Sequence, residues 1–200
     1  MDFWNLTLFC IAAIVLLGSP GPAIAALIAV GRKNGFAGGL PFYGGLQAGL
    51  ACAAAISAAG LYSLLQAVPG ATTIMVIVAT SYLVFLSYKI ATSPVGQKIT
   101  TNPSGFAGTA YGGFLLGITN PKAYVAFVSI MASYLIIPSN STADAGIKWI
   151  VCVIVMIVVD IIWLWLGDFI RRASLSMKAE KAMNIAMGAT IFATAFLAYR

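Results

Sequence analysis

Two charged residues interrupt long apolar stretches of this chain, and they are the residues best placed to do chemistry. Lys122 lies within the apolar stretch 111–137, and Asp160 lies within the apolar stretch 149–170. A charge at the centre of a bilayer costs about 2.5 to 3.5 kcal/mol on insertion scales, so such residues are usually kept for a function. We expect Lys122 to line the path of a solute; the alternatives are that it reaches an interface or pairs with a carboxylate.

Asp160 has two candidate roles and one structural alternative. It could take up and release a proton if its neighbours change between conformations, or it could hold the ammonium group of a substrate. The structural alternative is a static ion pair with Lys122. Asp168 lies beside Arg171 and Arg172, where a salt bridge at the membrane interface is the simpler role.

Two proline motifs lie within apolar stretches of the chain. Residues 18–22 read GSPGP, and residues 117–123 read GITNPKA. Proline inside a helix removes a hydrogen bond and clashes with the preceding turn, so we expect both helices to be interrupted. The freed backbone groups need partners, and in a membrane the break must therefore face protein or a water-filled cavity. A simple packing kink is the alternative for residues 18–22.

Each interruption is expected to start a new half-helix. Asn120 is a strong N-cap residue and Pro121 suits the first helical position, while Gly21 and Pro22 can play the same parts less strongly. Helix N-termini offer free N–H groups and a positive dipole end, so two of them facing each other could hold a substrate carboxylate. The predicted substrate-binding residues are Pro20, Gly21, Pro22, Asn120, Pro121 and Lys122, and the predicted proton-coupling residue is Asp160.

The composition places these motifs in a membrane protein. Of the 200 residues, 61% are hydrophobic and 8% are charged, against about 25% charged in a soluble domain. We therefore expect an all-α integral membrane protein with about six transmembrane helices, in a single domain that covers residues 1–200. The stretches long enough to cross a bilayer are 3–30, 40–67, 71–90, 111–137, 149–170 and 182–199. Polar residues within them, expected to bond helices together, are Gln47, Ser81 and Asn184.

The basic residues predict which loops are cytoplasmic. All of the 11 Lys and Arg residues except Lys122, Lys148 and Arg200 lie in or beside the first, third and fifth loops. Such residues tend to stay on the cytoplasmic side, so both termini are expected outside. No basic residue precedes the first stretch, which is therefore expected to be a retained span. The net charge of +6 does not form one patch, and we expect no nucleic-acid partner.

The two halves of the chain show a faint similarity. Gly and Pro have the same spacing in the two proline motifs, and residues 85–89 (FLSYK) resemble residues 196–200 (FLAYR). Many transporters are built from two copies of one unit in opposite orientations. We predict an inverted repeat of three plus three spans, with broken first and fourth helices and halves at approximately residues 1–91 and 110–200.

The two proline motifs, with the basic GRKNG loop at residues 31–35 between them, resemble the LysE-type translocator family of bacterial lysine and homoserine/threonine exporters. Size and six-span layout extend the resemblance over essentially the whole chain. It implies an exporter of amino acids or related small zwitterions in the bacterial inner membrane, driven by the proton gradient. It carries substrate binding onto the residues of the two motifs, and it neither supports a role for Asp160 nor names the substrate.

The alternatives are an exporter of another solute or metal ion, a membrane-embedded enzyme, and a scaffold. The chain has no His, and its three cysteines are isolated, which disfavours a transition-metal path and a redox pair. Asp160 and Asp168 lie on one predicted helix and do not face each other as a protease dyad would. A scaffold needs no charge within a span. We expect no enzymatic activity, cofactor or metal. The expected partners are the lipid bilayer, a small zwitterion and protons, and the sequence leaves open whether the chain forms a homo-oligomer.

Overall fold

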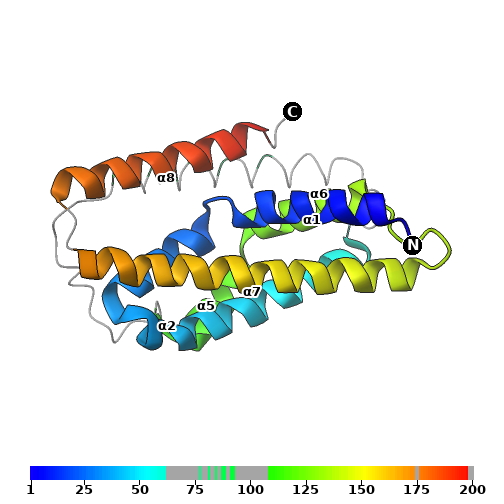
Figure 1. Cartoon of the computed structure of the whole chain (residues 1–200), viewed down its shortest axis with the longest axis horizontal. Helices are drawn as coiled ribbons and strands as arrows, with labels where there is room; N and C mark the ends of the chain where they lie inside the picture. Colours follow the sequence, from blue (N-terminus) through cyan, green and yellow to red (C-terminus); the bar gives the residue numbers. More distant parts are fainter. Residues whose placement is uncertain are drawn as a thin grey trace.

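The described part of the chain is helical (Figure 1). The computed structural model describes residues 1–61, 108–173 and 176–197, and single positions between 77 and 92. The predicted third span, residues 71–90, lies outside the continuously described residues, so the count of six spans and the inverted repeat stay predictions. The elements are α1 (Phe3–Gly18), α2 (Pro22–Ile56), the π-helix η1 (Ser57–Leu61), α5 (Ala110–Ile118), α6 (Pro121–Ser133), α7 (Ser141–Ala173) and α8 (Met177–Leu197).

Both predicted helix interruptions are present. α1 ends at Gly18 and α2 begins at Pro22, while α5 ends at Ile118 and α6 begins at Pro121. A proline starts each new helix, where its missing N–H has no intrahelical partner to lose. The axes of α5 and α6 differ by 51° across their break. The two proline motifs therefore do what their sequences predict, and each divides one apolar stretch into two helices.

α2 itself consists of two helical arms that meet at Gly35. Gly35 has φ of 75° and ψ of 176°, a left-handed conformation that glycine adopts at little cost. Figure 1 shows the chain running towards one end of the molecule before this residue and returning after it. The predicted loop at residues 31–35 is thus a single turning residue, and residues 31–34 remain helical.

α7 begins earlier and ends later than the predicted span at residues 149–170. The side chain of Asn140 accepts a hydrogen bond from the Ala143 amide at 3.0 Å, so it caps the new helix at this point. α8 also begins earlier than predicted, and the Ser176 hydroxyl accepts a bond from the Ala179 amide at 3.3 Å. The two loops predicted around α7 are therefore shorter, because side-chain caps start helices that hydropathy alone places further along the chain.

Length and composition identify α2 and α7 as candidate membrane spans, and α5 with α6 as a third, broken one. α1 is apolar but shorter, at 16 residues. The outward side of α7 is suited to lipid because large apolar side chains cover it. These exposed residues are Ile150, Ile154, Val158, Ile162, Trp165 and Phe169. The described helices are therefore those of a membrane protein, as the composition predicts.

Glycines bring the backbones of α2 and α5 into contact. Gly49 of α2 lies against Gly117 of α5, Gly45 lies against Ala110, and Gly113 lies against Phe42. A Cβ atom on Gly113 would lie only 2.1 Å from the carbonyl oxygen of Phe42, so no larger residue fits without a shift of the backbone. Small residues at helix interfaces permit this close approach in membranes.

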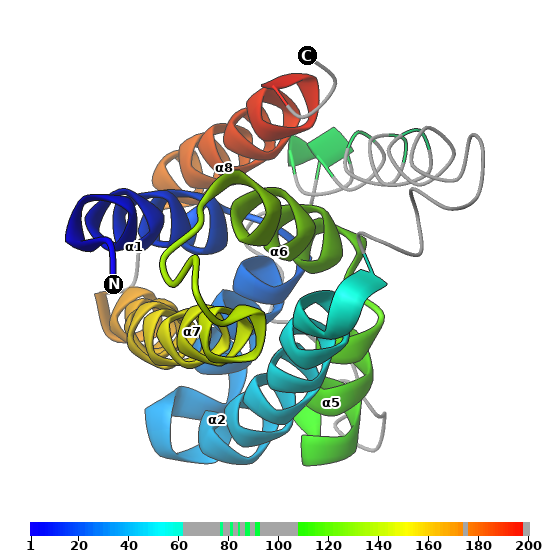
Figure 2. The same ribbon diagram turned by 90° about the vertical axis from the view of Figure 1, so that its right-hand side faces the viewer.

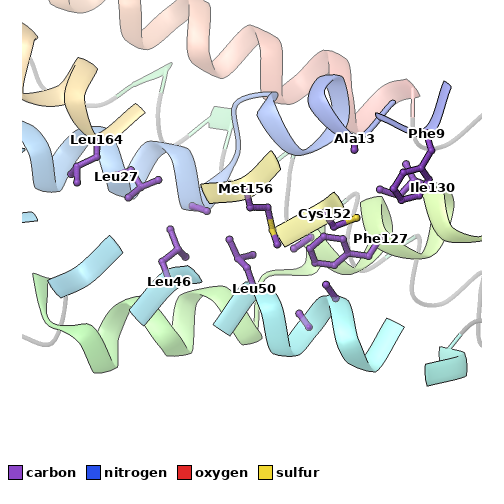
Figure 3. Close-up of a cluster of buried hydrophobic side chains, with 14 of the residues drawn as sticks. Phe9, Ala13, Leu27, Leu46, Leu50, Phe127, Ile130, Cys152, Met156 and Leu164 are labelled. Carbon is purple, nitrogen blue, oxygen red and sulfur yellow. The ribbon is translucent and has the colours of Figure 1, made fainter. Parts of the chain in front are cut away.

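α7 packs against both α1 and α2 in the described bundle. Figure 2 shows it between α2 on one side and α1 on the other. It crosses the first arm of α2 at Gly31 and Gly167, where a Cβ on Gly167 would lie 2.5 Å from the Ile28 carbonyl oxygen. The buried apolar core lies among α1, α2, α6 and α7 (Figure 3); it includes Phe9, Ala13, Leu27, Leu46, Leu50, Phe127, Ile130, Cys152, Met156 and Leu164.

Candidate functional site

The two helix interruptions meet at the side chain of Lys122. This residue follows Pro121 at the start of α6, and it is only 8% exposed. Its Nζ atom donates a hydrogen bond to the Ser19 carbonyl oxygen in the break between α1 and α2. A Cβ on Gly21 would lie 2.6 Å from Cδ of Lys122, so the glycine leaves room for the lysine. Lys122 therefore points into the protein and bridges two segments that are far apart in sequence.

The N-terminus of α6 is closed by its own residues. The Asn120 side-chain oxygen accepts from the Lys122 amide at 3.2 Å, and the Asn120 carbonyl accepts from the Ala123 amide at 3.1 Å. These bonds satisfy amides that the sequence motif predicted to be free for a ligand. What α6 contributes to the site is the positive end of its dipole and the Lys122 ammonium.

The N-terminus of α2 is open by contrast. Gly21 occupies the N-cap position and has no side chain with which to cap the helix. In the first turn of α2, the Ala25 amide donates to the Gly21 carbonyl at 2.9 Å. The amides of Ala23 and Ile24 have no acceptor among the described residues, and both residues line the cavity beside Lys122. Two unpaired N–H groups at a helix N-terminus form a ready site for an anion.

Asp160 lies on α7 and is 3% exposed. Its Oδ2 atom accepts a hydrogen bond from Nε2 of Gln47, on the second arm of α2, at 2.8 Å. No ion pair joins Asp160 to Lys122 in the part of the chain that the structure describes, where Lys122 donates to the Ser19 carbonyl instead. The static ion pair considered from the sequence is thus not formed in this conformation.

A cavity of about 30 Å³ separates these two charges. A water molecule needs roughly 10 to 15 Å³ of such space, and small-molecule sites usually span about 300 to 1,000 Å³. In this conformation the cavity is therefore too small for an amino acid. The predicted residues that line the cavity are Gly21, Asn120, Lys122 and Asp160. The predicted residues that shape the helix ends without lining it are Pro20, Pro22 and Pro121.

A second buried charge pair lies near the start of α7. Asp144 and Lys148 form an ion pair of 2.5 Å beside a cavity of about 200 Å³. Asp144 also accepts from the amides of Ile136 and Ile137 at 2.7 and 2.8 Å, and Lys148 donates to the Met131 carbonyl at 3.0 Å. This pair holds the end of α6 and the segment after it. Asp144 lies in a segment that the sequence predicted to be a loop. The spacing of four residues between Asp144 and Lys148, which is typical of an ion pair on a helix, could have indicated this pair.

The cluster at the far end of α7 is the salt bridge that the sequence predicts. Asp168 binds Arg171 and Arg172, each at 2.6 Å, and its own side chain is 3% exposed. A Cβ on Gly35 would lie 3.0 Å from Nη2 of Arg171, so the cluster also touches the turn between the arms of α2. Its contacts are structural, and it lies outside the cavity between Lys122 and Asp160.

Interrupted helices whose ends meet at a buried cavity are typical of secondary transporters. Residues 14–200 match the family model of the LysE type translocators, and the chain belongs to this family. The resemblance seen in the proline motifs is therefore confirmed. Members of the family are transporters, which also confirms the prediction that the chain is not an enzyme.

Curated relatives cover most of the chain at low identity. The cysteine/O-acetylserine efflux proteins of Salmonella paratyphi A and Salmonella typhi are each 23% identical over 177 residues, which is 86% of this chain and 83% of theirs. A protein described as an uncharacterized membrane protein of Vibrio cholerae is 24% identical over 191 residues, covering 90% of this chain and 91% of its own. No solved structure matches the chain significantly.

Proposed function

We propose that this protein exports amino acids or related small zwitterions across the bacterial inner membrane in exchange for protons. The observation that carries the proposal is a buried cavity lined by one cation, Lys122, and one anion, Asp160, that are not paired with each other. An amino acid carries the two complementary charges. Family membership supports transport, and the efflux function in the names of the Salmonella relatives supports export.

The substrate carboxylate binds, in this proposal, where the two helix interruptions meet. The open amides of Ala23 and Ile24 and the Lys122 ammonium can all donate to one carboxylate. Lys122 would exchange its present acceptor, the Ser19 carbonyl, for the substrate. This exchange loosens a contact between α6 and the break before α2, which links binding of the substrate to movement of the helices.

Proton coupling is assigned in this proposal to Asp160. Moving one elementary charge through about 100 mV supplies roughly 2.3 kcal/mol. At about 1.4 kcal/mol for each factor of ten, one proton supports a gradient of roughly fiftyfold. A single titrating carboxylate in the cavity is therefore sufficient to drive useful export.

The direct test is counterflow of radiolabelled amino acids, including cysteine and O-acetylserine, in proteoliposomes. Lys122→Ala removes the cation from the cavity and is expected to reduce exchange by about 10- to 100-fold, the usual effect of losing a hydrogen bond to a charged group. Lys178→Ala is the matched control, since Lys178 is exposed at the start of α8 and is expected to leave exchange unchanged. If folded Lys122→Ala protein exchanged amino acids at near wild-type rates, the substrate carboxylate would have to bind elsewhere.

A further inference from the structure

In the side-chain amide of Gln47, the nitrogen has a hydrogen-bond partner and the oxygen has none among the described residues. Its Nε2 atom donates to Asp160 at 2.8 Å, joining α2 to α7. Its Oε1 atom is buried and has no hydrogen-bond partner among the described residues. A buried acceptor without a donor is costly and uncommon, so its presence beside a charged cavity residue needs an explanation.

The polar group that the structure places against the Gln47 amide is the Asp160 carboxylate, which is itself an acceptor. Asp160 brings a negative charge, and its Oδ1 atom has no hydrogen bond within the described part of the chain. Asp160 lines the cavity, and so does Leu50, one helical turn after Gln47, whereas Gln47 contacts the cavity through its bond to Asp160 and does not line it in this conformation. The cation of the cavity, Lys122, donates to the Ser19 carbonyl and not to this acceptor pair. A small cation with several N–H donors is the chemistry that would satisfy both oxygens.

We propose that Asp160 and Gln47 together form the subsite for the ammonium group of the substrate, an inference that rests on the proposed function. A primary ammonium has three N–H donors and can reach both the Asp160 carboxylate and Gln47 Oε1. Nε2 of Gln47 meanwhile keeps its bond to Asp160 and holds the carboxylate in place. The zwitterion then lies across the cavity with its carboxylate towards Lys122. Gln47 thereby sets the preference for amino acids over carboxylates that lack an ammonium.

Gln47 is not needed merely to join the two helices, because a second bond does so one turn earlier. The Tyr43 hydroxyl donates to the Ile157 carbonyl at 2.9 Å, between the same α2 and α7. Tyr43→Phe therefore serves as a matched control that removes an interhelical hydrogen bond without changing the acceptor pair.

The test compares inhibition of counterflow by the best-exchanged amino acid and by its analogue without the ammonium. For cysteine, under reducing conditions, the analogue is 3-mercaptopropionate. Gln47→Met keeps the approximate size but removes the acceptor, so inhibition by the amino acid should weaken by about 10- to 100-fold. Inhibition by the analogue should not change, and the discrimination ratio should therefore collapse. Tyr43→Phe should keep the wild-type ratio.

Other outcomes would overturn the subsite. An equal loss for amino acid and analogue in Gln47→Met would mean that Gln47 only positions Asp160, and an unchanged ratio would mean that it has no role in recognition. Gln47→Glu keeps an acceptor oxygen, and two facing carboxylates can share one proton and so keep the bond to Asp160. This variant should keep the discrimination ratio, and a collapse of the ratio would contradict the proposal even if the Met variant does not fold. Wild-type protein that exchanges no amino acid would overturn the proposed function together with the subsite.

Discussion

The Asp160 carboxylate is held by a neutral amide and not by a salt bridge. Its described hydrogen-bond partner is Gln47, and it faces a cavity that a water molecule can enter. Adding a proton there breaks no ion pair among the described residues, whereas protonating Asp144 or Asp168 would break one or two. Of these three buried carboxylates, Asp160 is thus the one whose charge can change during a transport cycle with least disturbance of the fold.

Asp160→Asn keeps the shape of this side chain but removes its ability to titrate. We expect the variant to lose accumulation driven by an imposed pH gradient, because no proton can be carried. Exchange of substrate for substrate should persist at saturating concentration, since the Asn oxygen still accepts a hydrogen bond. Uphill transport into vesicles measures the first property, and counterflow measures the second. Full gradient-driven accumulation by well-folded Asp160→Asn would remove this residue from the coupling mechanism.

At the scale of elements, the contact between α2 and α5 depends on which side of α2 each glycine faces. Gly44 and Gly45 are neighbours in sequence, but a Cβ on Gly44 would meet nothing within 4 Å. A Cβ on Gly45 would lie 1.8 Å from the carbonyl oxygen of Ala110. Alanine at position 44 therefore tests helix propensity alone, whereas alanine at position 45 also tests the packing of α2 on α5.

Gly45→Ala is expected to lower the free energy of unfolding by about 1 to 3 kcal/mol, the usual cost of overpacking. Gly44→Ala should instead be neutral or stabilising by up to about 1 kcal/mol, because alanine is the better helix former. Thermal unfolding of the two purified variants in the same detergent measures the difference. Equal effects of the two substitutions would show that α5 does not pack on α2 through this face.

The sequence predicts a helix boundary well where a nearby residue, such as a proline, determines it. Proline at residues 22 and 121 breaks a helix wherever the helix lies, so both interruptions could be predicted, together with the cap at Asn120. The start of α7 was placed too late because hydropathy does not detect the capping bond of Asn140. The single-residue turn at Gly35 was predicted as a longer loop for a similar reason, since charged residues before it remain helical.

The sequence predicted those residues of the candidate site that are charged within an apolar stretch or belong to a proline motif. Lys122 and Asp160 stand out in apolar stretches, and the structure places both at one cavity. Gln47 was predicted only to bond helices together, because its neighbour Asp160 is 113 residues away in sequence. Its unpaired oxygen is a property of how α2 packs on α7, and no local pattern encodes it.

At the scale of the whole molecule, a group of basic residues lies at one end of the bundle and the N-terminus lies at the other. The turn at Gly35 lies beside Arg171, so the basic residues just before the turn share one end of the molecule with those in the last turn of α7. The N-terminus lies at the other end, where the Asp2 amide donates to the Ile136 carbonyl at 2.8 Å. Figure 1 shows these two ends at opposite sides of the bundle. Which of the two ends is cytoplasmic stays a prediction from the basic residues.

We predict that Arg32, Lys33, Lys98, Arg171 and Lys178 are cytoplasmic, while Thr142 and both termini are external. Single cysteines at positions 33, 142 and 178, in a background without Cys10, Cys52 and Cys152, can be labelled from either side of the membrane. Position 142 should react with an impermeant reagent from outside, and positions 33 and 178 only from inside. External reactivity at 33 or 178 would contradict the six-span orientation.

Given the proposed function, the small size of the cavity between Lys122 and Asp160 affects the amino-acid concentration at which export begins. Its volume of about 30 Å³ has no room for an amino acid, so binding must wait for a more open form. If that form makes up about one part in a hundred, the apparent affinity is about a hundredfold weaker than the intrinsic one. With this weaker affinity, the proposed exporter would transport little of an amino acid at its ordinary concentration and more of it when it accumulates. In the proposed function, a small cavity at rest would therefore spare the metabolites that the cell still needs.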